Sequence, residues 1–113
     1  MTMTEQAFLV LTALAREPMH GYGIVGEVAG ISGDRVKLKV GTLYGVLDRL
    51  VTEGLVAPDR DEVHNGRLRH YYRLTDAGRG ELAAEAARQA ANAQAAVARL
   101  QAGPRQHPAG GTA

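Results

Sequence analysis

The sequence has 113 residues, 45% of them hydrophobic, with no cysteine and no tryptophan, and a chain of this length is expected to form one domain with a modest core. The lack of cysteine excludes disulfides, thiolate metal sites and cysteine nucleophiles, and it fits a cytoplasmic protein. No apolar run is long enough to cross a membrane, and the N-terminal residues lack the pattern of a signal peptide, so no membrane association is expected.

The net charge of +1 is unevenly distributed along the chain. Residues 1–34 carry one Arg against four acidic residues, a net charge of −3. Residues 35–73 carry eight Lys or Arg against five acidic residues, a net charge of +3, and residues 74–113 carry four against three, a net charge of +1. A polyanionic partner is therefore expected to bind the middle third of the chain.

Two helices are predicted in the first third of the sequence. Thr2 and Glu5 have the spacing of a capping box, which predicts a helix from residue 3. Apolar residues at helical spacing continue this helix until Pro18 ends it. A second, shorter helix fits residues 21–30, and the glycine-rich segment 30–34 that follows it predicts a turn.

The basic middle third contains a third helix and a hairpin. The alternation in "RVKLKV", residues 35–40, predicts a very short strand that leads into a helix over residues 40–53. Gly54 ends this helix, and residues 55–74 predict two strands joined at Asn65-Gly66, because both turn positions tolerate positive φ. One face of the third helix forms an apolar stripe that is expected to be buried: Leu43, Val46, Leu47, Leu50 and Val51.

The last predicted helix is long and begins at its capping residue, Thr75. It runs to about residue 102, and the segment 103–113 is expected to be a disordered tail. A thin stripe on this helix buries little within one subunit, so we expect it to pack on a second copy of the chain. The stripe consists of Leu82, Ala86, Ala90, Ala93, Val97 and Leu100.

The order of these elements predicts a mainly α protein with a small β-hairpin. Three helices followed by a two-stranded hairpin is the plan of a winged helix-turn-helix, here with one long C-terminal dimerisation helix. The predicted organisation is a DNA-binding domain over residues 1–74, the dimerisation helix over 75–102 and the tail over 103–113.

Gly21, Gly23 and Gly26 spell G-x-G-x-x-G, the pattern of a dinucleotide-binding loop. Such a loop must follow a strand and open a helix within a parallel βαβ unit. Here the glycines follow a segment of helical period that ends at a proline, and no second parallel strand follows. We therefore expect structural roles: Gly21 at the start of the second helix, and Gly23 and Gly26 allowing close helix packing.

The third helix has an outer face suited to contact with a DNA duplex. Its small residues let the backbone come close, its N-terminal amides can hold a phosphate, and Thr42 can contact phosphate or base. Lys37 and Lys39 precede it and can hold backbone charge; the alternative is an ordinary solvated face. The outer face consists of Gly41, Thr42, Gly45, Asp48, Arg49 and Thr52.

The second strand of the hairpin gives the DNA interpretation more weight. Its alternation places Arg67, Arg69 and Tyr71 on one face, with Arg67 directly after the turn. A basic tip beside a recognition helix can reach an adjacent groove, whereas an edge strand protected by charge explains the arginine pair less well. The other face carries Leu68, His70 and Tyr72.

No constellation in the sequence predicts catalysis, a metal or a cofactor. His20, His64 and His70 match no usual ligand spacing. Ser32 is the only serine and lies in a glycine-rich turn, so a Ser-His-Asp triad is not expected. The sequence therefore predicts a protein without enzymatic activity.

The segments "HGYGI" (20–24), "GTLYGVLDRLVTEGLV" (41–56) and "NGRLRHYYRLTDAGRGEL" (65–82) resemble the PadR family of bacterial transcriptional regulators, and the likeness extends over roughly residues 5–100. The resemblance implies a winged-helix homodimer that represses promoters and is released by a ligand or stress signal. It also implies residues at or near the DNA: Tyr22, Thr42 and Tyr44, with Asn65, Arg67 and Arg69 on the wing.

The sequence departs from the family in two places. Gly45 stands where the family usually has proline after G-T-L-Y, and the paired tryptophans of the drug-binding members are absent. The single long C-terminal helix resembles the short-tailed branch of the family. We expect a homodimer on a pseudo-palindromic operator of double-stranded DNA. The rival interpretations are a winged-helix module for protein–protein contact and a small-molecule sensor, both without DNA binding.

Overall fold

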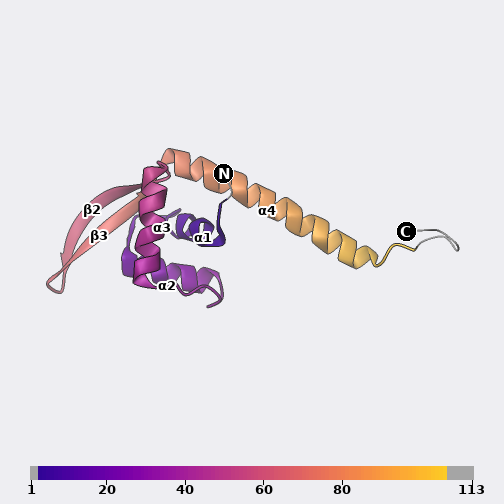
Figure 1. Ribbon diagram of the computed structural model, residues 1–113, viewed down its shortest axis with the longest axis horizontal. Helices are drawn as coiled ribbons and strands as arrows, with labels where there is room; N and C mark the ends of the chain where they lie inside the picture. The colour runs from indigo at the N-terminus through magenta and orange to yellow at the C-terminus, as the bar shows by residue number, and fades with distance from the viewer. Residues whose placement is uncertain (1–2, 107–113) are drawn as a thin grey trace.

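The computed structural model describes residues 3–106 as three packed helices, a small sheet and a long final helix. In Figure 1 the hairpin extends to one side of the helices and the last helix to the other, and the molecule measures 74 × 27 × 22 Å. The arrangement confirms the predicted winged helix-turn-helix with a long C-terminal helix. The elements in chain order are α1 (Glu5–Ala13), β1 (Met19–His20), α2 (Gly21–Ile31), α3 (Val40–Thr52), β2 (Val56–His64), β3 (Arg67–Leu74) and α4 (Asp76–Ala102).

The hydrophobic core lies where α1, α2 and α3 meet. Three leucines of the predicted stripe on α3 are almost fully buried there, while Val46 and Val51 are half-buried at its margin. Removal of such side chains from water is the main force that holds these short helices together. The buried apolar residues are Leu9, Val10, Leu11, Ala13, Leu14, Ile24, Val28, Leu38, Leu43, Leu47, Leu50 and Val56.

The sheet has three antiparallel strands in the order β1-β3-β2. The predicted hairpin is confirmed, and at its turn Asn65 and Gly66 have φ values of 50° and 77°, as a two-residue primed turn requires. The strand β1 was not predicted, because two residues are too short to show a period. It pairs Met19 with Tyr72 and His20 with Tyr71, which joins the base of the hairpin to the start of α2.

Three predictions for the first forty residues are wrong. The first helix begins at Glu5, and Thr4 caps it by accepting a hydrogen bond from the Ala7 amide (3.1 Å); Thr2 lies outside the described residues. This helix ends at Ala13, well before Pro18. The strand predicted over residues 35–40 does not form, because this segment is paired with no other strand in the described chain.

The glycines of the G-x-G-x-x-G pattern have separate surroundings. Gly21 opens α2 as predicted, and a Cβ there would lie 3.0 Å from the Tyr44 hydroxyl. The predicted close helix packing at the other two is wrong. A Cβ on Gly23 would meet side chains of β1 at 3.7 Å, and Gly26 has no atom within 4 Å of that position.

The start of α4 belongs to the packed body of the protein. The Thr75 hydroxyl accepts a hydrogen bond from the Gly78 amide (3.0 Å), which confirms the predicted cap. Gly78 is buried, and a Cβ there would overlap the carbonyl oxygen of Leu55. Leu82 is half-buried against the core, but every described residue from 86 to 106 is exposed. The predicted tail over residues 103–113 lies outside the described residues from position 107 onward.

Candidate nucleic-acid interface

The first turn of α3 presents bare backbone to solvent. Its N-cap, Lys39, makes no side-chain hydrogen bond to the helix, so no capping side chain occupies the first amides. Gly41 and Thr42 are exposed, and neither Gly41 nor Gly45 has an atom within 4 Å of its would-be Cβ. Free amides at a helix N-terminus attract anions, and the open glycines leave room for a close approach.

Two lysines precede this turn on a segment that is fixed from within. Leu38 is buried, whereas its neighbours Lys37 and Lys39 are exposed. The buried Ser32 hydroxyl accepts a hydrogen bond from the Val36 amide (3.0 Å) and donates one to the Ala29 carbonyl oxygen (3.2 Å). Sequence reasoning missed this role for Ser32; its place between the turn and the alternating segment was the available signal.

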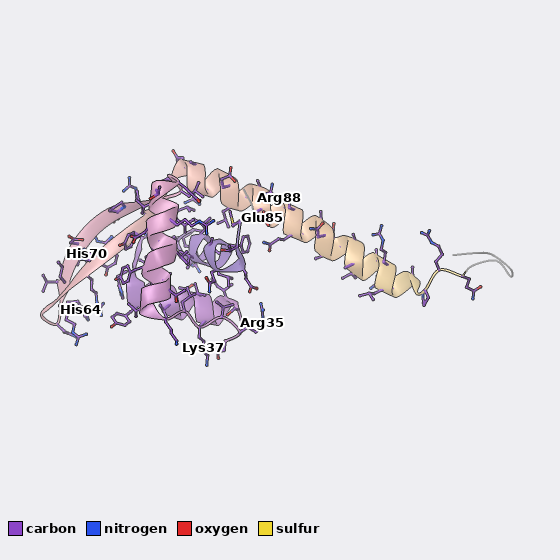
Figure 2. The ribbon with its side chains drawn as sticks, viewed as in Figure 1. Arg35, Lys37, His64, His70, Glu85 and Arg88 are labelled. Carbon is purple, nitrogen blue, oxygen red and sulfur yellow. The ribbon has the colours of Figure 1, made fainter. Side chains whose placement is uncertain are left out.

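The wing tip lies on the same side of the view in Figure 2 as Lys37. In Figure 2 the side chains of Lys37 and His64 lie on the lower side of the view, with the N-terminal end of α3 between them. Arg67 is exposed beside the turn and faces His64 across the ladder. We call this the α3–wing surface, and it consists of Lys37, Lys39, Gly41, Thr42, Gly45, Asn65 and Arg67.

The acidic residues of β2 are paired within the wing. Arg60 contacts Asp59 at 3.0 Å and Glu62 at 2.8 Å, and its guanidinium also lies 4.1 Å above the ring of Tyr71. The hydrogen bond from Arg60 lowers the pKa of Glu62. Asp61 lies 2.8 Å from a ring nitrogen of His70. These pairings screen the negative charge of β2, and no ion pair of Arg67 occurs within residues 3–106.

A small polar cluster joins the wing to α2. His20 caps α2, and its Nδ1 accepts a hydrogen bond from the Gly23 amide (3.3 Å). Its Nε2 lies 3.3 Å from Nη1 of the half-buried Arg69, and the ring packs edge-on against Tyr71. Burial lowers the pKa of His20, and the positive charge of Arg69 lowers it further. Sequence reasoning missed this cluster, although the position of His20 before a helix indicated a cap.

The remaining predicted site residues fall into two groups. Tyr22 is 66% exposed on the first turn of α2, whereas Tyr44 is half-buried and places its hydroxyl against the start of α2. Burial raises the pKa of Tyr72, which lies beside Tyr44 at the base of the sheet. The last three residues of the outer face, Asp48, Arg49 and Thr52, lie farther along α3, and Arg49 pairs with Glu53 (3.4 Å).

The described residues show no grouping suited to a metal ion. Among positions 3–106, no three His, Asp or Glu side chains gather in such an arrangement. His20 serves as a helix cap and His70 contacts Asp61, which explains two of the three histidines considered as ligands. In the same residues, no helix is long and apolar enough to span a bilayer.

The fold and this surface define a winged helix-turn-helix protein of the class found in transcriptional regulators. The sequence pattern of the family described as "Transcriptional regulator PadR-like family" matches residues 10–84. The chain belongs to this family, which is one of regulators and not of enzymes.

Known relatives and solved structures agree with this assignment. A 37.1 kDa protein of transposon Tn4556 from Streptomyces fradiae is 43% identical over 86 residues, which are 76% of this chain and 23% of that protein. A PadR family regulator from Eggerthella lenta is 30% identical with a TM-score of 0.69, over 86% of this chain and 82% of that one. Bacillus subtilis PadR in complex with operator DNA is 26% identical with a TM-score of 0.62, and the likeness covers 72% of this chain and 46% of that one.

Proposed function

We propose that this protein binds double-stranded DNA as a homodimer and represses transcription from the promoter it occupies. In this proposal residues 1–74 form the DNA-binding domain and residues 75–102 form the dimerisation helix. The observation that carries it is the uncapped, uncovered first turn of α3, flanked by two exposed lysines and lying on the same side as the wing tip.

The first turn of α3 enters the major groove in this proposal. The N-terminal residues of a recognition helix are those that approach the base edges. Gly41 and Gly45 leave the backbone bare, and Thr42 supplies one hydroxyl for a phosphate or a base. In the proposed complex, Lys37 and Lys39, which precede this turn, contact the phosphates beside it. Tyr22, exposed on α2, extends the contact along the same strand.

The wing contributes affinity more than sequence reading. Arg67 is exposed at the tip with its charge free of ion pairs in the described chain, and Asn65 holds the turn. Arg69 is half-buried at His20, which favours a role in fixing the wing while its charge adds to the local potential. A basic tip of this shape suits the minor groove or its phosphates.

The exposed part of α4 supports the proposed dimerisation. Its 27 residues make a rod of about 40 Å, and from residue 86 onward no described residue covers the rod. Leu82 packs within the body, so the surface left for a second copy begins one turn later. We call this surface the α4 stripe, and it consists of Ala86, Ala90, Ala93, Val97 and Leu100.

The relation between two subunits sets the form of the operator. A two-fold dimer presents two copies of α3, so its site is a pseudo-palindrome with half-sites about 34 Å apart or a multiple of that distance. Bacillus subtilis PadR, which is similar to this chain, has been crystallised in complex with operator DNA. Repression is the simplest consequence, because a dimer seated on a promoter occupies DNA that polymerase requires.

A cavity among α1, α3 and α4 favours a small-molecule effector as an added function. It has a volume of about 370 Å³ and is lined by apolar side chains, such as Leu50 and Leu55, together with four charged ones, Arg49, Glu53, Glu81 and Arg88. Concave sites that combine apolar walls with polar groups able to orient a ligand are typical ligand sites. A compound that binds there would raise the melting temperature of the protein, and in a DNA-binding assay it would cause the protein to release the duplex.

Fluorescence anisotropy with a labelled duplex from the protein's own upstream region tests the proposal. We expect binding to this duplex at least roughly a thousandfold tighter than to a random duplex of equal length. Its affinity should fall steeply as salt rises, because phosphate contacts release counterions. Equal, weak binding to both duplexes would contradict the proposal and favour the protein-contact module.

A further inference from the structure

The end of α3 and the start of α4 are joined by a connected set of hydrogen bonds. Helix α3 ends in a Schellman motif, in which Gly54 has a φ of 78° and its amide donates to the Val51 carbonyl oxygen (3.0 Å). In the same motif the Leu55 amide donates to the Leu50 carbonyl oxygen (2.9 Å). The backbone of Gly54 and Leu55 is therefore fixed to the last turn of α3.

Thr75, the N-cap of α4, binds both of these residues. Its hydroxyl donates a hydrogen bond to the Gly54 carbonyl oxygen (2.7 Å), and its amide donates one to the Leu55 carbonyl oxygen (3.1 Å). The same hydroxyl accepts the hydrogen bond from the Gly78 amide that caps α4. Because a threonine hydroxyl can donate and accept at once, this one oxygen links the end of α3 to the start of α4.

Two further contacts fix the direction in which α4 leaves the body. Gly78 is buried, and a Cβ there would overlap the Leu55 carbonyl oxygen and lie 2.8 Å from Cδ1 of Leu74. One turn after the cap, Nη2 of Arg79 donates a hydrogen bond to the Ala15 carbonyl oxygen (3.2 Å), just beyond the end of α1. Helix α4 is thus attached to α3 at its cap and to the end of α1 one turn later.

Beyond this junction α4 acts as a long lever. Figure 1 shows it leaving the body beside the end of α3, and every described residue from 86 to 106 is exposed. The middle of the α4 stripe, at Ala93, lies about 27 Å along the helix axis from Thr75. A change of about 10° in the angle at the junction would move that point by about 5 Å, which exceeds the rise of one base pair, about 3.4 Å.

We propose, on the basis of the proposed function, that Thr75 and Arg79 are positioning residues that set the distance between the two copies of α3 in the dimer. Each α4 pairs with its partner through the α4 stripe and holds its own α3 through this junction. The junction lies at the C-terminal end of α3, whereas the DNA contacts are assigned to its first turn. Thr75 and Arg79 therefore determine which half-site spacing the dimer accepts, without touching the DNA.

A series of duplexes with altered half-site spacing tests the inference in the full-length protein. The half-sites are moved one or two base pairs closer together or farther apart than in the upstream duplex. We expect the affinity of the wild type to fall about tenfold for a change of one base pair, because a rigid dimer fits one spacing. Thr75→Val, which removes the hydroxyl and keeps the side-chain shape, should bind the whole series within about threefold. Its affinity for a single half-site should equal that of the wild type.

Thr75→Ser and Arg79→Met are the matched variants. Thr75→Ser keeps the hydroxyl and should retain the spacing preference of the wild type. Arg79→Met removes the attachment to the Ala15 carbonyl oxygen at an exposed position, so it should keep the melting temperature and still widen the range of spacings accepted. Arg79→Met therefore carries the test even if Thr75→Val loses stability.

A distance measurement without DNA gives an independent readout. The chain has no cysteine, so Asp48→Cys introduces one site for a spin label at an exposed position of α3. Pulsed electron spin resonance should give one narrow distribution of distances between the two labels of the dimer. Adding Thr75→Val should broaden it by about 5 Å, the displacement expected for a tilt of about 10°, and adding Thr75→Ser should not.

The inference is overturned if folded Thr75→Val or Arg79→Met protein keeps both the narrow distribution and the sharp spacing preference. It is also overturned if Thr75→Ser behaves as Thr75→Val does, because the hydroxyl would then not be the group that acts. A wild type that binds no duplex, or that gives no distance between two labels, would overturn the proposed function itself, and the inference would fall with it.

Discussion

Two surfaces of this protein are left uncovered by residues 3–106, and they differ in chemistry. The α3–wing surface presents open backbone amides, small residues and exposed cations. The α4 stripe presents alanine methyl groups, with Val97 51% and Leu100 81% exposed. The first therefore suits a polyanion and the second suits another apolar helix. The proposed function accordingly assigns them different partners, a nucleic acid to the first and a second copy of the chain to the second.

The largest effect is expected from a charge placed on the α4 stripe. Ala93→Glu puts a carboxylate where two helices would meet, and burying it unpaired is strongly unfavourable. Sedimentation should show a monomer, and operator affinity should fall by about a hundredfold or more, because the two half-sites are no longer linked. Ala95→Glu, on the other side of the same helix, should leave both unchanged. A dimeric Ala93→Glu protein would place the subunit contact elsewhere.

A smaller effect is expected at the tip of the wing. Arg67→Ala removes one phosphate contact per subunit, so the salt slope of a dimer should fall by about two units. Operator and random duplex should weaken by similar factors, of about ten, at moderate salt. Titrations at four salt concentrations measure both quantities. Loss of operator affinity alone would make Arg67 a residue that reads sequence.

Thr42 should contribute one hydrogen bond at each half-site. Thr42→Ala is expected to cost about 1 kcal/mol per half-site, the usual scale of such a bond. Because Thr42 is exposed, the melting temperature should not change. Thr42→Ser keeps the hydroxyl and serves as the control. If serine and alanine weaken binding equally, the methyl group and not the hydroxyl makes the contact.

The smallest effect is a dependence of stability on pH that involves only the cluster of His20 and Arg69, which joins the wing to α2. The pKa of His20 is lowered by burial and by Arg69, so the neutral ring stabilises the fold above pH 6.5. This stabilisation is lost as the pH falls below 6.5 and through the lowered pKa. The melting temperature should therefore fall more in the wild type than in His20→Asn, which keeps a capping group that does not titrate.

His20 has charged neighbours that belong to the same measurement. Arg69 and His64 oppose its protonation, whereas Glu62 favours it. Sedimentation over the same pH range should show no change of mass, because the cluster lies outside α4. A wild type and a His20→Asn variant with parallel pH profiles would show that the cap does not titrate in this range.

Elements with strong local signals could be predicted from the sequence. The leucine stripe of α3, the Asn65-Gly66 turn and the Thr75 cap each act within a few residues, and each is confirmed. The start of α1 was misplaced because Thr2 has the capping-box spacing to Glu5, whereas the cap of the helix is Thr4, whose side chain accepts from the Ala7 amide. The alternation at 35–40 has the period of a strand, but a strand also needs a neighbour, and sequence alone does not show one.

The site could be predicted only in outline. The exposed glycines of α3 followed from their place opposite a buried stripe, and the two lysines from their place directly before the helix. The contact between His20 and Arg69 joins residues 49 positions apart, and no periodicity predicts a contact of that kind. The half-buried state of Arg69 and Tyr44 was missed for the same reason, because β1 brings α2 against the wing.

Gly41→Glu tests most directly whether α3 enters the groove. The variant adds bulk and negative charge at the first turn, where phosphates should lie, and helical Gly41 has open space for the side chain. Gly80→Glu makes the same change at an equally open helical glycine on α4 and is the control. We predict that both variants keep the melting temperature and dimer mass of the wild type, and that only Gly41→Glu loses operator binding, by about a hundredfold or more. A folded, dimeric Gly41→Glu protein that binds the operator as tightly as the wild type would contradict the account.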